Sequence, residues 1–474
     1  MRQLYIDGEW VEADSNDGIE VDSPIDGSVL DEVPDGSAGD VRRAVEAARR
    51  AERELAAMTV FERAAVLDEV TEYFEAHEDE IAEGITREEG KPLEESYEET
   101  EYVIASSDDY AHDAIRLFGD VVPSEFRGRF AYTQREPYGP CAVISPWNFP
   151  LEIPGGSIYS AIATGNPVVF KPAEETPLTA YHVARAFDQS SLPDGAFNLV
   201  TGAGDTGASL VDHRDVRLIA FTGSTAVGQE IAKTAAERNA QCLLEMGGKD
   251  PILVLDDADV EHAAESIVVG STANAGQVCC GTERVITTEG VHDELVEAIT
   301  EKTEALQVGD PLDEATEIGP MVSERIQRTA VEHVESAVEA GATLRTGGDT
   351  DGRYYTPAVL DDVTERMDIA REETFGPVTP VIRAEGYDDA IEIANRSRYG
   401  LQAAIFTDSL ERAHDAANRL QAGGVFVNET NNYWERLLPF GGYGESGSGG
   451  RYGSKWHLES MTQVKAVMMN YKND

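Results

Sequence analysis

The spacing of apolar residues divides the chain into a helical first part and a longer part in which strands and helices alternate. Between residues 41 and 117, apolar residues recur three and four positions apart, which predicts amphipathic helices. The pattern then changes to short apolar runs separated by helical segments. These runs are typical of buried strands and lie at residues 141–145, 167–171, 197–201, 218–222 and 242–246.

A second alternating series follows, with a helix expected over residues 259–275 and strands over 251–255, 284–287, 379–384, 403–407 and 424–428. Strands separated by helices indicate βαβ units and parallel sheets. The sequence therefore predicts an α/β fold with two domains in tandem. The glycine-rich segment 439–453 is expected to be a loop, and the apolar run QVKAVMM (463–469) an edge or intersubunit strand.

Composition adds a strong acidic bias to this picture. The 474 residues include 89 acidic and 38 basic ones, which leaves a net charge of −51. The acids are spread along the chain, and at low salt such charge destabilises a compact state. Because concentrated counterions would screen it, we expect a protein of a salt-rich cytoplasm. The same charge argues against nucleic acid as a partner, since phosphate binding needs basic patches.

The cysteines and the termini point to an intracellular protein. Four cysteines are too few for a disulfide framework, and their spacing fits no zinc motif, so no metal is expected. The N-terminal MRQLYIDGEW lacks the apolar core of a secretory signal. No apolar run approaches the roughly 20 residues of a membrane span. We expect a cytoplasmic location and no membrane partner.

Two glycine turns are candidates for phosphate binding. GAGDTG (202–207), which contains Gly204, matches a dinucleotide-binding pattern, but Thr222 stands about 20 positions on, where that pattern asks for an acid. A plain tight turn is the alternative. FTGSTAVG (221–228) follows the next strand, and Ser224 and Thr225 can cap the helix that begins there. The free N–H groups of such a helix would suit a pyrophosphate; an ordinary N-cap is the alternative.

Polar residues at strand ends are further candidates. Lys171 ends an apolar strand, and with Glu174 it could hold ribose hydroxyls; a surface ion pair is the alternative. Glu245 ends another strand, where burial would raise its pKa toward that of a general base, unless it is a structural hydrogen-bonded residue. Asn148, held between two prolines, could donate to an oxyanion or simply form a turn.

The segment NAGQVCCG (274–281) places Cys279 and Cys280 between two glycines. A buried cysteine is usually a small apolar residue, whereas a nucleophilic one needs an accessible setting that favours the thiolate. We interpret the glycines as allowing the backbone to approach a substrate. A serine or Cys–His hydrolase is unsupported, because the sequence has no G-x-S-x-G motif and no histidine near the cysteines.

Taken in order, these segments resemble the NAD(P)-dependent aldehyde dehydrogenase superfamily over nearly the whole chain. The resemblance rests on LYIDGEWVEA, REPYGPCAVISPWNFP, GNPVVFKPAEETP, FTGSTAVG, LEMGGKDP, NAGQVCCGTER, EETFGPV and LPFGGYGESGSG. It implies that the Cys279 sulfur attacks an aldehyde, with the Asn148 amide and the Cys279 N–H holding the oxyanion. Hydride transfer to a nicotinamide would leave a thioester, which water activated by Glu245 would hydrolyse to a carboxylic acid.

The resemblance also implies a cofactor site, a domain plan and an oligomer. The implied cofactor contacts are Lys171 and Glu174 at the adenosine ribose, Trp147, Ser224 and Gly204 toward the phosphates, and Glu373 and Phe375 at the nicotinamide ribose. Because an acid at position 174 repels a 2′-phosphate, we expect NAD rather than NADP, although NADP is possible. The dinucleotide-binding domain would comprise residues 1–117 and 137–246, the catalytic domain 247–446, and a small β extension for oligomerisation 118–136 and 455–474. We expect a homo-oligomer, a tetramer rather than a dimer.

Other functions remain open at this point. An acyl-coenzyme A-forming relative would generally lack the base at Glu245. A semialdehyde-specific enzyme would use Arg436 to bind a carboxylate, with Tyr433 and Trp434 lining the tunnel. Gly155 and Gly156 predict a wide entrance, because many relatives have bulkier residues there. A non-catalytic binding protein of the same fold is the alternative from another class.

Overall fold

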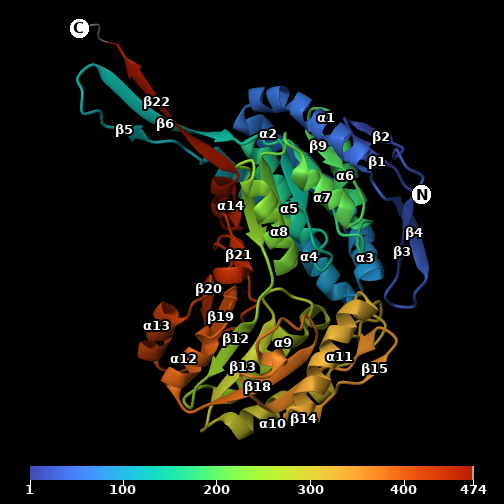
Figure 1. Cartoon of the computed structure of the whole chain (residues 1–474), viewed down its shortest axis with the longest axis vertical. Coiled ribbons are helices and arrows are strands. Elements are labelled where there is room, and N and C mark those ends of the chain that lie inside the picture. Colours follow the sequence, from blue (N-terminus) through green and yellow to red (C-terminus); the bar gives the residue numbers. More distant parts are fainter. Residues whose placement is uncertain (472–474) are drawn as a thin grey trace.

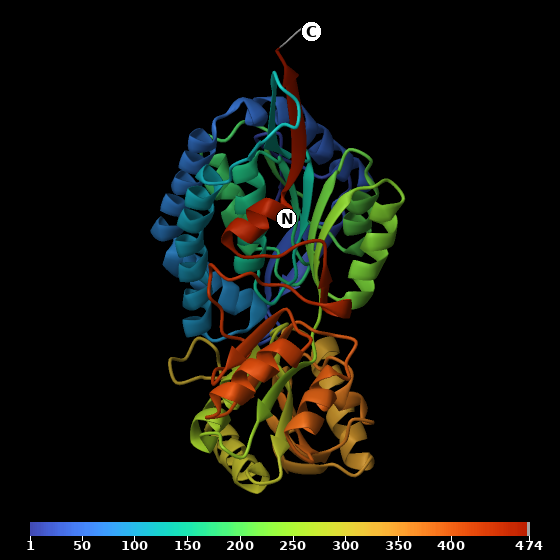
Figure 2. The ribbon, with the colours of Figure 1, turned by 90° about the vertical axis from the view of Figure 1, so that its left-hand side faces the viewer.

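Two sheets covered by helices form two lobes, and a narrow β arm projects from the first lobe (Figures 1 and 2). The computed structural model describes residues 1–471. Four helices precede the first parallel strands: α1 (Ala38–Ala57), α2 (Val60–Ala76), α3 (Glu78–Glu89) and α4 (Leu93–Ile115). They agree with the helical pattern of this region.

The first lobe contains an eight-stranded sheet in the order β2-β1-β9-β8-β7-β10-β11-β21. Its parallel strands are β7 (Cys141–Ile144), β8 (Val168–Lys171), β9 (Phe197–Leu199), β10 (Leu218–Thr222) and β11 (Gln241–Glu245). The antiparallel edges are β1 (Leu4–Ile6), β2 (Glu9–Val11) and β21 (Gly447–Ser448).

Alternate residues of these strands bury against different helices, as the two-residue period of a strand requires. Cys141 and Val143 pack with α2, α4, α5 (Glu152–Thr164) and α6 (Thr179–Asp188), whereas Ala142 and Ile144 pack with α1, α7 (Gly204–Asp212) and α8 (Thr225–Ala236). A hairpin of β3 (Gly18–Asp22) and β4 (Val29–Pro34) lies beside this lobe.

The second lobe contains a seven-stranded sheet in the order β14-β17-β18-β13-β12-β19-β20. The strands are β12 (Asp250–Val254), β13 (Thr282–Thr288), β14 (Thr343–Thr346), β17 (Ala358–Val363), β18 (Val378–Ala384), β19 (Gln402–Phe406) and β20 (Gly424–Val427). One face packs on α9 (Val260–Thr272) and α10 (His292–Ala305), and the other on α11 (Glu324–Glu339), α12 (Tyr387–Asn395) and α13 (Leu410–Arg419). A short β15–β16 ribbon (Thr350–Asp351, Tyr354–Tyr355) completes the lobe.

The strand order reverses in the middle of each sheet, between β7 and β10 in the first and between β12 and β19 in the second. In open α/β sheets, ligands bind beyond the carboxyl ends of the strands at such a point. In the first lobe this edge faces the second lobe (Figure 2). The fold therefore predicts a site between the two lobes, on the loops that follow β7, β10 and β11.

The arm is a three-stranded antiparallel sheet of β5 (Val121–Val122), β6 (Arg129–Pro137) and β22 (Thr462–Asn470) (Figure 1). Its long pairing joins residues 129–137 to 462–470. The apolar side chains of Val121, Phe130, Val464 and Met468 are exposed on it.

The predicted α/β class, with two parallel-sheet domains and a small β extension, is confirmed. The structure differs in detail at residues 455–474: the segment begins with helix α14 (Ser454–Ser460), which packs on α4 and α5, and only then enters the arm. Residues 472–474 of that segment lie outside the described residues. Within residues 1–471, no helix has the length and hydrophobicity needed to cross a membrane.

Candidate active site

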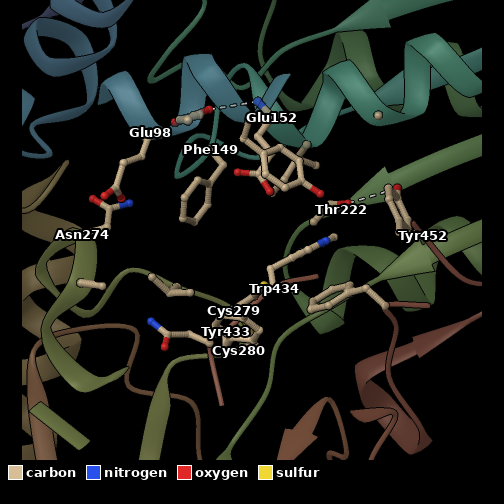
Figure 3. A pocket seen from close by; sticks show the side chains of 18 of the residues that line it. Glu98, Phe149, Glu152, Thr222, Asn274, Cys279, Cys280, Tyr433, Trp434 and Tyr452 are labelled. Carbon is tan, nitrogen blue, oxygen red and sulfur yellow. Dashed lines mark hydrogen bonds between the residues drawn. The ribbon is translucent and has the colours of Figure 1, made fainter. Parts of the chain in front are cut away.

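Two cavities meet at Cys279. The larger one, of about 510 Å³, lies between α4, α5 and the loops around residues 273–280 and 430–440 (Figure 3). The smaller one, of about 250 Å³, lies between the loops after β7, β10 and β11 and the loop before β18. Cys279 and Thr222 line both cavities. Cys279 is therefore accessible from both cavities.

The loop before β13 positions Cys279. Asn274 and Ala275 both adopt left-handed backbone angles, with φ of 48° and 52°. Gly276 has a φ of 71°, and a Cβ there would stand 2.1 Å from the carbonyl carbon of Gly376. Gly281 lies against the Val278 and Gly270 carbonyls. Our interpretation of these glycines was wrong: close packing of backbone against backbone requires Gly276, and neither glycine lines a cavity.

The two adjacent cysteines have different surroundings. Cys280 is 5 % exposed and belongs to the core of the first lobe, whereas Cys279 is half-buried at the junction of the cavities. A hydrogen bond to Cys279 and burial raise the pKa of the Cys280 thiol well above its ordinary value. Cys280 therefore stays protonated, and Cys279 is the more accessible nucleophile.

Two hydrogen-bond donors lie beside Cys279: the side-chain amide of Asn148 and the backbone N–H of Cys279 itself. The Asn148 side chain donates through Nδ2 to the Gln277 carbonyl oxygen at 2.8 Å, which uses one of its two amide hydrogens. Asn148 and Cys279 line the smaller cavity together. In the part of the chain that the structure describes, the Cys279 N–H has no acceptor. An oxygen atom bound next to Cys279 could accept from both groups.

Glu245, at the end of β11, lines the larger cavity. Burial raises its pKa well above the usual range, although Arg451 and the Gly442 N–H lower it. Its Oε2 atom accepts from the Gly442 N–H at 3.3 Å, and Oε1 has no partner. A Cβ on Gly441 would lie 2.5 Å from Oε1, so glycine is needed beside the carboxyl group. These are the surroundings of a general base.

The smaller cavity contains the predicted nicotinamide-side residues. Glu373 accepts from the Gly248 N–H at 3.0 Å through one oxygen, and within residues 1–471 no hydrogen bond reaches its other oxygen. Burial and Glu283 raise its pKa to about 8. Trp147 and Phe375 meet edge to face with ring centroids 5.4 Å apart. A carboxylate oxygen beside two aromatic rings fits a ribose and a planar ring.

The predicted phosphate and adenosine contacts lie farther along the same edge. Ser224 lines the smaller cavity at the start of α8, but its side chain makes no capping hydrogen bond, so the first N–H groups of this helix stay free. These groups fit a pyrophosphate. Lys171 donates to the Pro172 carbonyl oxygen and lies 3.5 Å from Glu174. Gly204 begins α7 in open surroundings and lines neither cavity.

A buried ion pair behind Asn148 was missed by sequence reasoning. The Lys91 ammonium donates to Glu99 at 2.7 Å and to the Asn148 carbonyl oxygen at 2.8 Å, and both side chains are fully buried. Glu99 also accepts from the N–H groups of Leu151 and Glu152. Burial lowers the Lys91 pKa, but Glu99 and Glu89 more than offset this and leave it raised. The pair fixes the backbone of Asn148 and of the residues that follow it.

Helix α4 contributes a wall of the larger cavity that the sequence analysis also missed. Its lining residues are Glu95, Glu98, Glu99, Tyr102, Ser106 and Tyr110. Their spacing of three and four is that of one helix face. The sequence does show polar and aromatic residues along one stripe of this helix. Such a stripe does not by itself distinguish a helix face that lines a cavity from one that faces solvent.

Only some of the residues predicted to line the substrate tunnel lie in the larger cavity. Tyr433 and Trp434 line the larger cavity. Arg436 does not: it pairs with Asp109 at 2.8 Å and is partly exposed. Gly156 lines the cavity, where a Cβ would meet the Tyr110 hydroxyl at 3.0 Å, whereas Gly155 packs against Val103 of α4. Only one of the two glycines therefore widens the cavity.

Comparison with known proteins agrees with this fold and site. The aldehyde dehydrogenase family profile matches residues 10–467. The chain is 38 % identical to α-ketoglutaric semialdehyde dehydrogenase of Bacillus subtilis, with 98 % of this chain and 97 % of that protein covered. The chain belongs to the aldehyde dehydrogenase family. The predicted family and enzyme class, an NAD(P)-dependent oxidoreductase, are thus confirmed.

Solved structures show the same likeness. Betaine aldehyde dehydrogenase from Staphylococcus aureus, in complex with NAD⁺, has a TM-score of 0.97 and 32 % identity, and the match covers 100 % of this chain and 96 % of that one. An NADP-dependent enzyme of Escherichia coli has a TM-score of 0.97 and 34 % identity, with coverage of 99 % and 98 %. Both cofactors therefore occur among its structural neighbours.

We predict that Lys91→Met destabilises the protein by about 3–5 kcal/mol, because it leaves Glu99 buried without its counter-ion. The free energy of unfolding in urea would measure this. Lys233→Met is the matched control: its exposed pair with Glu230 should contribute less than about 1 kcal/mol. Equal effects of the two substitutions would contradict the assigned role of Lys91.

Proposed function

We propose that the protein is a hydrolytic aldehyde dehydrogenase in which Cys279 is the nucleophile and Glu245 the base. The observation that carries this proposal is the position of Cys279 at the junction of two cavities. One cavity contains Glu245 and the other contains Glu373. An aldehyde and a cofactor could thus reach the same sulfur from different sides.

The first step is attack of the Cys279 thiolate on the aldehyde carbon, which forms a carbon–sulfur bond and a negatively charged oxygen. The free hydrogen of the Asn148 amide and the free N–H of Cys279 would stabilise that oxygen. A nicotinamide cofactor held by Glu373 and Phe375 would supply the hydride acceptor, and loss of hydride from this carbon would leave a thioester on Cys279.

The second step is hydrolysis of the thioester. The Glu245 carboxylate takes a proton from water, the resulting hydroxide attacks the thioester carbon, and the Cys279 sulfur leaves as the carboxylic acid forms. A buried carboxyl group with a raised pKa is suited to this proton transfer. Release of the acyl group to coenzyme A is the alternative, and the presence of a base at position 245 favours hydrolysis.

For the cofactor we propose NAD over NADP. Glu373 and Phe375 would contact the nicotinamide ribose, Trp147, Ser224 and Gly204 the phosphate side, and Lys171 and Glu174 the adenosine ribose. The Glu174 carboxylate lies beside Lys171 and offsets the charge that a 2′-phosphate would need. Repulsion between that carboxylate and a 2′-phosphate favours NAD.

We predict that Glu245→Gln separates the two steps. The first turnover should still release about one NADH per Cys279, whereas steady-state acid release should fall about 10²–10⁴-fold, the usual contribution of a general base. Rapid-mixing absorbance would measure both. Glu237→Gln, at an exposed position, is the control and should behave like the unaltered protein. Unchanged acid release from Glu245→Gln would count against hydrolysis by this base.

The proposed domains are 1–117 with 137–246 for the dinucleotide, 247–446 for catalysis, and 118–136 with 455–474 for oligomerisation. The proposed assembly is a homo-oligomer, a tetramer rather than a dimer. Support for the last proposal comes from the arm, where β22 lies at the edge of the described sheet and has the exposed apolar side chains Val464, Met468 and Met469. A second copy of the chain would cover both.

Removal of residues 462–474 should therefore convert the oligomer to monomers, as measured by light scattering after size-exclusion chromatography at constant salt. Removal of residues 472–474 alone is the control and should leave the assembly intact. Identical masses for the two shortened chains would exclude the arm as the assembly surface.

We also propose that the protein works in a salt-rich cytoplasm, because its net charge of −51 needs screening. Its melting temperature should rise when KCl is increased from about 0.1 M to about 1 M, where the Debye length falls from about 10 Å to about 3 Å. Differential scanning calorimetry would measure this. A melting temperature that falls over this range would refute the proposal.

A further inference from the structure

The walls of the larger cavity are acidic and contain no basic group. Five carboxyl groups line the cavity, and none of its described lining residues is a lysine, arginine or histidine. The five are Glu95, Glu98, Glu99, Glu152 and Glu245. A ligand of this cavity therefore meets carboxyl groups, which become negative as they lose their protons, and no positively charged residue in the described lining.

Two of these carboxylates have no partner in the protein. Glu99 is neutralised by Lys91, and Glu95 accepts from the Asn274 N–H at 2.9 Å. By contrast, within residues 1–471 no hydrogen bond or ion pair reaches the side chain of Glu152, which is partly exposed to the cavity, or that of Glu98. Figure 3 shows both on the side of the cavity opposite Cys279 and Cys280. Glu98 is exposed to solvent, whereas ionisation of the unpaired Glu152 inside the cavity is costly unless a ligand supplies the counter-ion.

Aromatic rings surround the same space. Trp434 stacks on Phe440 with centroids 4.3 Å apart and meets Tyr102 edge to face at 6.0 Å. The ring of Phe149 projects into the cavity (Figure 3), and one of its faces already holds a cation, because the Lys91 ammonium lies 4.0 Å from its centroid. Aromatic faces attract cations most strongly where water is excluded.

The acidic bias of the whole chain does not explain this cavity. That bias is spread over solvated surfaces, whereas Glu152 begins α5 in the interior, directly after the loop that contains Asn148. The smaller cavity, in the same protein, includes Arg325 in its lining. The absence of basic residues is therefore a property of the larger cavity.

We propose that the larger cavity selects aldehydes that carry a positive charge, such as a quaternary ammonium or a protonated amine, and disfavours those that carry a carboxylate. The cation would lie between Glu152 and the aromatic rings while the aldehyde carbon reaches Cys279. This inference rests on the proposed function and adds the substrate class. It argues against the alternative in which Arg436 binds the carboxylate of a semialdehyde. Arg436 pairs with Asp109 and does not line this cavity.

The charge of Glu152 makes the preference depend on pH. Burial and Glu99 raise the pKa of Glu152 to about 8, and Lys91 lowers it. The other unpaired or weakly paired carboxyl groups of the cavity, Glu95, Glu98 and Glu245, also have raised pKa values, so they gain negative charge in the same direction of pH. Tyr102, Tyr110 and Cys280 have raised pKa values and stay neutral up to about pH 8. A carboxyl group with a pKa of about 8 gains its charge as the pH rises from 7 to 9. Preference for a cation should therefore increase over that range.

The test compares two aldehydes of equal shape, trimethylammonioacetaldehyde and its neutral isostere 3,3-dimethylbutanal, with NAD at constant salt. We expect kcat/KM to favour the cation by about tenfold or more, since a desolvated cation–aromatic contact alone gives roughly that ratio. Glu152→Gln should reduce the ratio at least about fivefold. Asp108→Asn, which removes one charge from the exposed face of the neighbouring helix α4, is the control and should leave the ratio unchanged.

The possible results separate this inference from the proposed function. Oxidation of the neutral aldehyde as fast as the cationic one, or faster oxidation of succinic semialdehyde, would overturn the inference and leave the dehydrogenase proposal intact. If none of the three aldehydes yields NADH, the proposed function fails, and alkylation of Cys279 by iodoacetamide decides the inference. Protection by choline but not by its neutral isostere 3,3-dimethylbutan-1-ol would support a cation site; equal protection or none would overturn it.

Discussion

The contact between the Asn148 loop of the first lobe and the Cys279 loop of the second holds the site together. Asn148 donates to the Gln277 carbonyl, and Asn274 donates back to the Asn148 carbonyl at 3.0 Å. The same carbonyl accepts from Lys91. The first two hydrogen bonds join the lobes, and the third fixes the Asn148 segment within the first lobe. The lobes therefore cannot shift at this point without breaking two hydrogen bonds, and both cavities keep their common wall.

This arrangement also explains why buried charge is concentrated here. Lys91, Glu99 and Glu245 are at most a few per cent exposed, and each would be costly in an apolar core. Lys91 and Glu99 neutralise each other and fix the backbone, whereas Glu245 keeps one oxygen without a partner. The first two are therefore structural supports, and the third has the free acceptor that proton transfer requires.

Local sequence patterns were sufficient for the fold but only partly for the site. Alternating strands and helices predict two parallel sheets, and residues at the ends of strands, such as Lys171 and Glu245, lie where such sheets bind ligands. Glu373 and Phe375 precede a strand and were found only through family resemblance. Glu152 and the α4 stripe were missed because their importance depends on how α4 packs against α5 and against a loop about 180 residues away in sequence, near Asn274.

Covalent attachment of the substrate to the sulfur of Cys279 is the step on which the proposed reaction depends. Its most direct test is to incubate Glu245→Gln with NAD and an aldehyde, quench with acid, and locate the added acyl mass by peptide mass spectrometry. We expect one acyl group per chain, on Cys279, with Cys280 unmodified. An acyl group on Cys280, or NADH formation with no acyl group on either cysteine, would contradict it.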